Sequence, residues 1–170
     1  MKEKKVLLMG NPNVGKSTVF NELTGMHQHT GNWTGKTVDS ADGNFYYKYN
    51  NYRLIDLPGT YSLIPSSEEE RVAGEYLLKE KYDCVVIVID STLLQRNLML
   101  FYQILEITNK VVVMLNLCDE AKKRNIEIDK NILSNLLGVP VIKATARSGK
   151  GINELLEEIH LISTNSEDYY

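Results

Sequence analysis

The residues best suited to chemistry form a short segment near the N-terminus. Gly10, Gly15, Lys16 and Ser17 fit the pattern Gly-x-x-x-x-Gly-Lys-Ser, between an apolar run and a helical pattern. In this pattern backbone N–H groups cradle phosphates, aided by the positive end of the following helix. The lysine reaches the β- and γ-phosphates, and the serine hydroxyl coordinates Mg²⁺. A chance glycine-rich turn would not explain the placement. We therefore predict a phosphate site made of Gly10, Asn11, Pro12, Asn13, Val14, Gly15, Lys16, Ser17 and Thr18.

A second polar segment indicates which base the nucleotide carries. Asn116, Leu117, Cys118 and Asp119 follow the apolar run 111–115, at the edge where open α/β sheets bind ligands. The aspartate can accept hydrogen bonds from the N1–H and the exocyclic amine of guanine. Adenine lacks that donor pair and would leave the carboxylate unpaired. Asn116 is expected to tie this loop to the base and to the phosphate loop. Asn-x-x-Asp alone is weak evidence, since both residues are common in loops, but downstream of a phosphate loop it predicts guanine.

Two further segments fall in the order expected of such a site. The first is Asp56, Leu57, Pro58 and Gly59. Its aspartate would hold Mg²⁺ through a water, and the Gly59 N–H would bond the γ-phosphate, so this loop should order in one nucleotide state and relax in the other. The second segment, Thr145, Ala146 and Arg147, would pack its backbone against the guanine and present an N–H to its O6. That tripeptide carries weight only as the fourth element in order.

Apolar runs of strand length alternate with helical patterns, which predicts an α/β fold with a mostly parallel sheet. A hairpin is expected over residues 38–57, with its turn at residues 50–51. A Ser67–Glu70 capping box should begin a helix that reaches about residue 81. The other expected strands are 6–9, 84–89, 111–115 and 140–143, and the other expected helices begin or lie at 18–23, 93–107, 131–137 and 152–162.

Composition restricts the class of partner. The 170 residues suit one domain, and the net charge of −3 argues against a broad nucleic-acid or anionic-membrane surface. The apolar runs are far shorter than the roughly 20 residues that span a bilayer. Cys84 and Cys118 have no metal-ligand spacing and are expected to be reduced thiols of a cytosolic protein. His27 and His29 are expected to be solvated, so no iron site is predicted.

The four segments in this order, on a matching ladder of strands and helices, resemble the Ras-like P-loop GTPases over residues 5–162. The resemblance implies a six-stranded, mostly parallel sheet with one antiparallel edge strand and helices on both faces. It also assigns residues 1–162 to a GTP-binding (G) domain. Residues 163–170 would be a tail.

Other residues resemble one family of GTPases, ferrous iron transport protein B. The resemblance is carried by the stretch Gly31-Asn32-Trp33-x-Gly-x-Thr37-Val38, by residues 56–63 and by Arg96-Asn97-Leu98. It implies that the tail leads to a helical domain and an Fe²⁺-transporting membrane region. The domain would lie at the cytoplasmic face of the cell membrane, and the fragment itself would be soluble. Self-association into a weak homo-oligomer is left open.

The resemblance also assigns roles to single residues. Thr37 would ligate Mg²⁺ beside Ser17 and Asp56 when GTP is bound. Asn13, with the backbone carbonyls of Gly31 and Trp33, would form a K⁺ site that supplies positive charge during hydrolysis. Thr60 follows Gly59, where Ras-like proteins carry a water-orienting glutamine, so hydrolysis should be slow unless K⁺ or a rearranged loop assists. Trp33, in a polar glycine-flanked loop, is expected to be exposed in one nucleotide state. Thr145 replaces the usual serine, a change that would affect nucleotide release.

The functional prediction is therefore a slow, K⁺-stimulated GTPase that switches with its nucleotide and regulates ferrous iron uptake. Lys16, Thr37, Gly59 and Asn13 are the expected catalytic residues. A soluble GTPase acting on RNA or the ribosome stays open, since asparagine-type phosphate loops occur there too. That class usually carries a basic RNA-binding appendage, which these residues lack. A P-loop kinase or ATPase is disfavoured by Asp119.

Overall fold

A computed structural model describes residues 3–25, 28–33 and 37–165. Its centre is a seven-stranded sheet in the order β2-β3-β4-β1-β5-β6-β7. Strands β4, β1, β5, β6 and β7 are parallel, and β3 is antiparallel to both of its neighbours. The strands are β1 (Lys4–Gly10), β2 (Gln28–Asn32), β3 (Asp39–Tyr47), β4 (Asn50–Asp56), β5 (Cys84–Asp90), β6 (Val111–Asn116) and β7 (Val141–Lys143). The predicted fold class is thus confirmed.

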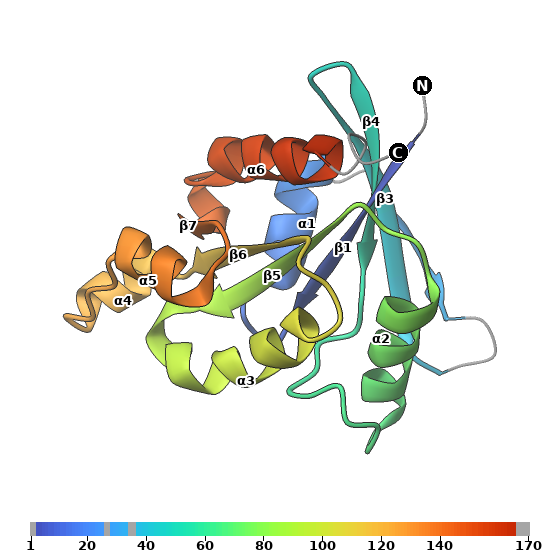
Figure 1. The fold of residues 1–170 in the computed structure, drawn as a ribbon, viewed down its shortest axis with the longest axis horizontal. Coiled ribbons are helices and arrows are strands. Elements are labelled where there is room, and N and C mark those ends of the chain that lie inside the picture. Colours follow the sequence, from blue (N-terminus) through green and yellow to red (C-terminus); the bar gives the residue numbers. More distant parts are fainter. Residues whose placement is uncertain (1–2, 26–27, 34–36, 166–170) are drawn as a thin grey trace.

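Helices cover both faces of the sheet and enclose two apolar cores (Figure 1). One core lies under α1 (Lys16–Thr24) and α6 (Ile152–Asn165), through side chains such as Phe20 and Leu155. The other lies under α2 (Glu68–Lys79), α3 (Leu94–Leu105) and α5 (Lys130–Leu137), where Phe101 is fully buried. Because β5 and β6 lie between both layers, every residue of these two strands is buried. Short helices η1 (Ser91–Leu93), α4 (Cys118–Lys123) and η2 (Ala146–Ser148) follow β5, β6 and β7.

Three local predictions need correction. The sheet has seven strands rather than six, because residues 28–32 add an edge strand to β3. The hairpin turn is formed by Lys48 and Tyr49, which both have positive φ, and not by the two asparagines that follow. Those asparagines already pair with β3, since a two-residue turn with positive φ at both positions matches the strand twist. Helix α4 was not predicted, because six residues are too few to show a helical period.

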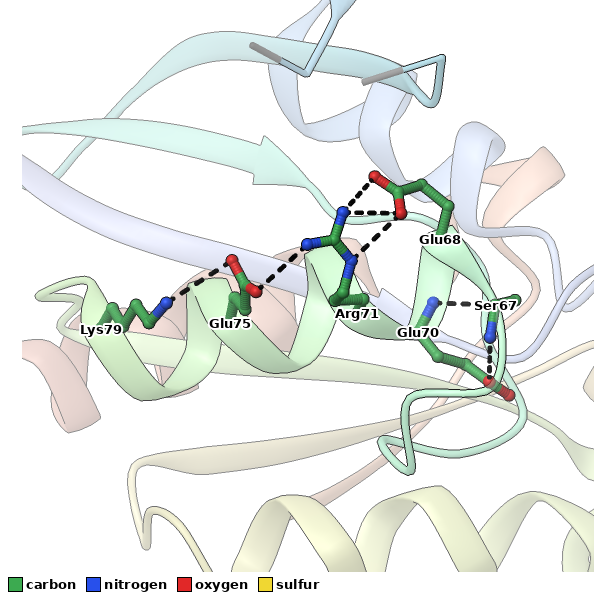
Figure 2. A network of polar contacts seen from close by, with 6 residues as sticks. All are labelled: Ser67, Glu68, Glu70, Arg71, Glu75 and Lys79. Atoms are coloured by element: carbon green, nitrogen blue, oxygen red, sulfur yellow. Dashed lines mark hydrogen bonds and ion pairs between the residues drawn. The ribbon is translucent and has the colours of Figure 1, made fainter. Parts of the chain in front are cut away.

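Helix α2 begins at the predicted capping box, which Figure 2 shows. The Glu70 N–H donates to Ser67 Oγ at 3.2 Å, and the Ser67 N–H donates to the Glu70 carboxylate at 3.0 Å. Removing an N-cap of this kind costs about 1 kcal/mol. Exposed ion pairs continue along the helix through Glu68, Arg71, Glu75 and Lys79. The box fixes the end of the loop that runs from Gly59 to α2.

Helix α6 is longer than predicted. It continues to Asn165, so Ser163 is a buried helical residue and not part of a tail. The Lys4 ammonium donates to the Ser163 carbonyl at 2.8 Å, which fastens the end of α6 to the start of β1. Residues 166–170 of the predicted tail lie outside the described residues. In the part of the chain that is described, no helix combines the length and apolar composition needed to cross a membrane.

Candidate nucleotide-binding site

The phosphate loop connects β1 to α1, and its backbone takes the shape that the sequence pattern predicts. Asn13 and Gly15 have φ values of 64° and 86°, in the left-handed region that glycine adopts without strain. A Cβ on Gly15 would lie 2.3 Å from Asn116 Nδ2, so only glycine fits there. Ser17, in the first turn of α1, is exposed, as is Asn13. The loop therefore presents its polar groups at the N-terminus of α1, where the helix dipole favours anions.

Lys16 is held by the strand next to β1. Its ammonium forms an ion pair with Asp56 Oδ1 and donates to the Leu57 carbonyl at 2.6 Å. Burial raises the pKa of the Asp56 carboxyl, and the charge and hydrogen bond of Lys16 act in the opposite direction. The predicted phosphate ligand and the predicted Mg²⁺ ligand thus meet directly. Phosphate oxygens or a cation at this place would compete for the same two groups.

The loop after β4 lies against the phosphate loop. The Thr60 N–H donates to the Gly10 carbonyl at 3.1 Å. A Cβ on Gly59 would come within 3.2 Å of Pro12 Cα, so a larger residue would push the two loops apart. The Thr60 side chain is 3% exposed, and its hydroxyl has no hydrogen-bond partner among the described residues. The Thr60 hydroxyl therefore faces inward.

Downstream, the same loop rests on α3. The Leu63 N–H donates to Gln103 Oε1 at 2.7 Å, and the Arg96 guanidinium lies 4.8 Å from the centre of the Tyr61 ring. Arg96 therefore helps to hold the loop after β4 in position through Tyr61. The position of this loop is set by α3 and by the capping box of α2.

Asn116, the last residue of β6, braces the part of the site where the sequence predicts the guanine base, here called the base side: residues 116–119 and 145–147. Its side chain is 2% exposed and makes two hydrogen bonds. Its Nδ2 donates to the Val14 carbonyl at 3.0 Å, and its Oδ1 accepts from the Ala146 N–H at 2.9 Å. One carboxamide thus joins the phosphate loop to the segment after β7, across 102 and 30 residues of chain. This is the tie to the phosphate loop that the sequence predicts.

Asp119 lies three residues further, in the first turn of α4. Its Oδ1 is buried and has no hydrogen-bond partner among the described residues. Its Oδ2 forms an ion pair with the Arg147 guanidinium. Burial raises the pKa of this carboxyl, but hydrogen bonds from the Glu120 backbone and from Arg147 outweigh burial and hold the pKa below its usual value. Asp119 is therefore a carboxylate with an acceptor atom that is buried and unused.

Sequence reasoning missed Ser91, which follows β5 and braces Asn116, and it named Asn97 only within the stretch Arg96-Asn97-Leu98. Ser91 is 2% exposed, and its hydroxyl donates to the Asn116 carbonyl at 2.6 Å. Asp90 accepts from the Thr92 N–H at 2.8 Å, and Asn97 donates to the Leu93 carbonyl at 2.9 Å. The available signal was a pair of polar residues directly after a buried strand, which places them at the same sheet edge as Asn116. The Arg147 side chain was also missed, because its tripeptide was assessed for backbone contacts.

A comparison with known proteins identifies the family. The sequence model of the family described as ferrous iron transport protein B matches residues 4–159. The chain belongs to this family. The chain is 41% identical over 162 residues to the Fe(2+) transporter FeoB of Campylobacter jejuni, covering 95% of this chain and 26% of that relative. It thus spans about a quarter of that relative's length.

Solved structures of the ferrous iron transport protein B family agree with the fold. The G domain of the T. maritima FeoB iron transporter superimposes with a TM-score of 0.90 at 44% identity, covering 95% of this chain and 99% of that one. The T. maritima cytosolic domain in a GDP form gives a TM-score of 0.91 at 44% identity, covering 96% of this chain and 64% of that one. This domain is thus a Ras-like G domain of that family.

The family's Gly31–Val38 stretch is only partly described, since residues 34–36 lie outside the described residues. Gly31 belongs to β2, and Thr37 is exposed. Trp33 is half-buried: its ring lies 5.2 Å from the Tyr76 ring on α2, edge to face. It packs against the second core through this contact with a distant helix, and its exposure in one nucleotide state stays a prediction.

One predicted ligand of each cation lines the same hollow. Asp56, predicted for Mg²⁺, and Gly31, predicted for K⁺, line an open hollow of about 470 Å³ beside β2, β3 and the end of β4; its other lining residues are Thr30, Asn32, Asp39, Ser40 and Ala41. Within residues 3–25, 28–33 and 37–165 no group of three or more His, Cys, Asp or Glu side chains is placed to hold a metal ion. His27 lies outside the described residues. The cation ligands predicted here are instead hydroxyl, carbonyl and carboxylate oxygens from separate segments.

Proposed function

We propose that this domain binds GTP and GDP, hydrolyses GTP slowly, and acts as a nucleotide-dependent switch for ferrous iron uptake by a longer membrane protein. The single observation that carries the proposal is the buried, unpartnered Oδ1 of Asp119, placed three residues from the brace at Asn116. Leaving such an acceptor unused costs free energy. A ligand that brings a donor to it recovers that cost.

Guanine supplies the donors that this acceptor lacks. Its N1–H and its exocyclic amine can both reach one carboxylate, and Asp119 lies three residues after Asn116, whose side chain is hydrogen-bonded to the phosphate loop. Adenine presents no such pair, so it would leave Asp119 Oδ1 unsatisfied. Sites built to hydrogen-bond a ligand group reject analogues without it by large factors. The GDP form of the T. maritima relative supports the same choice of base.

The phosphate side supports hydrolysis. Lys16 would leave Asp56 to contact the β- and γ-phosphates, and the Gly59 N–H would orient the γ-phosphate. Ser17, Asp56 and Thr37 offer the hard oxygen ligands that Mg²⁺ prefers, and the metal would neutralise phosphate charge. The Asn13 carboxamide and the carbonyls of Gly31 and Trp33 likewise suit K⁺, which would add positive charge beside the transferring phosphoryl group.

The role in iron uptake rests on the relatives' names and on the partial coverage of their length. As a nucleotide-dependent switch, the domain would regulate transport by the longer protein. Its partners would be the helical domain and the membrane region of the longer protein, at the cytoplasmic face. A net charge of −3 supports no nucleic-acid partner.

Calorimetric titration with GDP and ADP tests the base specificity. We expect GDP to bind at least about a thousandfold more tightly than ADP. The variant Asp119→Asn should lose GDP and gain xanthosine diphosphate, because xanthine replaces the exocyclic amine by a carbonyl that an amide can donate to. Asp42→Asn, which disturbs only the ion pair with Arg53 on the hairpin, is the matched control. Comparable affinity for GDP and ADP would sink the guanine proposal.

The gene sequence beyond Tyr170 tests the iron proposal separately. Several apolar segments of spanning length would support a membrane transporter. A basic RNA-binding domain at that place would overturn it in favour of a soluble GTPase.

A further inference from the structure

The carboxylate that should read guanine is already in contact with an arginine. The Arg147 guanidinium donates to Asp119 Oδ2, while Asp119 Oδ1 stays without a partner among the described residues. The Asp119 side chain is 25% exposed and that of Arg147 is 63% exposed. The arginine therefore reaches the carboxylate from the solvent side, and little packing holds it there.

The two donors offered to Asp119 are chemically alike. A guanidinium presents N–H groups on nitrogens joined through one carbon, and guanine presents the same N–C–N donor edge through N1 and its exocyclic amine. A carboxylate accepts either edge in the same fork geometry. Guanine that bonds both oxygens of Asp119 would use Oδ2, the oxygen that accepts from the Arg147 guanidinium, so the two donor groups would compete for the lone pairs and charge of that oxygen.

A second carboxylate next to Asp119 offers Arg147 another position. Arg147 Nη2 lies 3.6 Å from Glu120 Oε1, and Glu120 also accepts from Lys123 at 2.9 Å. Asp119 and Glu120 are neighbours at the start of α4. A small rotation of the exposed arginine side chain would move it from one carboxylate to the other.

We propose that Arg147 is an internal competitor for the guanine site, which occupies Asp119 when the base leaves and moves to Glu120 when the base binds. This inference rests on the proposed guanine binding. Its effect is to lower guanine-nucleotide affinity and to speed release. Because the ion pair is exposed, the expected size is about two- to fivefold, in keeping with the small energies of such pairs.

The direct test is Arg147→Met, which keeps the chain length and removes every donor. Arg124→Met is the matched control, since it removes the same charge from an exposed arginine at the end of α4. Fluorescent GDP is bound to each protein and chased with unlabelled GDP. We expect Arg147→Met to release GDP two- to fivefold more slowly and to bind it correspondingly more tightly, and Arg124→Met to behave as the parent. Faster release or weaker binding in Arg147→Met would mean that Arg147 orients Asp119 for the base, which overturns competition.

Glu120→Gln provides the opposite change. It weakens the second position of Arg147, so GDP affinity should fall, and adding Arg147→Met to it should restore the affinity of Arg147→Met alone. An equal effect of Glu120→Gln with and without Arg147 would contradict the proposal.

Salt gives an independent readout. Raising NaCl at fixed KCl screens the Arg147–Asp119 pair, so the affinity ratio of Arg147→Met to the parent should fall toward one. A ratio that does not change with salt would count against an ionic competitor. ADP titrations of the same proteins separate the two levels of inference. Selective GDP binding with no effect of Arg147→Met removes only the competition, whereas loss of GDP selectivity in the parent removes the function it rests on.

Discussion

The base side and the phosphate side of this site are built in different ways. On the base side, Asn116 is buried and joins three segments through hydrogen bonds within the protein. On the phosphate side, Lys16 is held by Asp56 and Leu57, groups from which phosphate oxygens would draw it away. Strand β2 has one neighbouring strand, β3, and the Trp33 ring packs against Tyr76 of helix α2. One side is braced before any ligand arrives, and the other is made of exchangeable contacts.

That difference suits a switch. A base pocket that keeps its shape holds GTP and GDP alike, because the two nucleotides share the base. The γ-phosphate is the only difference between them, so the contacts that respond must be on the phosphate side. A ligand shifts an equilibrium only through interactions that differ between its two states. The exchangeable contacts of Lys16 and of the loop after β4 are placed where that difference acts.

The largest effect is expected from breaking the brace. Asn116→Ala leaves the Val14 carbonyl and the Ala146 N–H without partners in the interior. At about 1–3 kcal/mol for each of these two unsatisfied groups, the free energy of unfolding should fall by about 2–6 kcal/mol, and GDP affinity should fall at least about a hundredfold. Urea unfolding and calorimetric titration measure the two quantities.

Asn135→Ala, at an exposed position of α5, is the control and should match the parent in both. If Asn116→Ala were as stable as the parent, the base side would not depend on this brace.

A smaller, pH-dependent effect is expected on the phosphate side. Lys16→Met leaves the half-buried Asp56 carboxylate without its cation, which should cost about 1–3 kcal/mol near pH 8. Burial already raises the pKa of Asp56, and loss of Lys16 raises it further. When the pKa of a carboxyl is raised in the folded state, the protein loses stability as the pH rises. The loss begins near the ordinary pKa of 3.8 and continues through the folded-state pKa. The cost of Lys16→Met should therefore shrink as the pH is lowered.

Thermal unfolding of the ligand-free protein at several pH values between 5 and 8 checks this dependence. Lys150→Met, at an exposed position after η2, removes an equal charge and should show no such trend. A cost of Lys16→Met that is constant with pH would mean that Asp56 is not the partner that matters.

The smallest expected effect concerns K⁺. GTP turnover should be about tenfold faster in KCl than in NaCl, and Asn13→Ala should remove most of that difference while leaving GDP affinity within about threefold. Phosphate release measured in the two salts gives the result. Equal rates in both salts for the unmutated protein would remove the cation from the proposal and would place all switching in the loop after β4.

The base side could be predicted from the sequence because its signals are local. Asn116 and Asp119 directly follow a buried β-branched run, and the edge of a parallel sheet places such residues beside the phosphate loop. The hairpin and the capping box of Ser67 are local in the same sense. The box was predicted at its own residues, and the hairpin turn was predicted two residues from its place.

The features that the sequence did not predict depend on contacts between segments that are far apart in the chain. Strand β2 depends on pairing with β3 and has little apolar pattern of its own. Half-buried Trp33 contacts Tyr76, which is 43 positions away in the chain, and nothing in the loop around Trp33 marks that partner. The Arg147 contact with Asp119 crosses from one loop to another. Contacts between residues that are far apart in the sequence leave no periodic pattern or fixed spacing in it.

The contact between Trp33 and Tyr76 gives the domain an intrinsic fluorescence probe. Trp33 is the single tryptophan of the chain, so all indole emission comes from the segment that precedes Thr37. The wavelength of that emission depends on whether the ring lies against α2 or in water. Stopped-flow fluorescence can therefore time the movement of this segment in the unlabelled protein, as nucleotide binds and as it leaves.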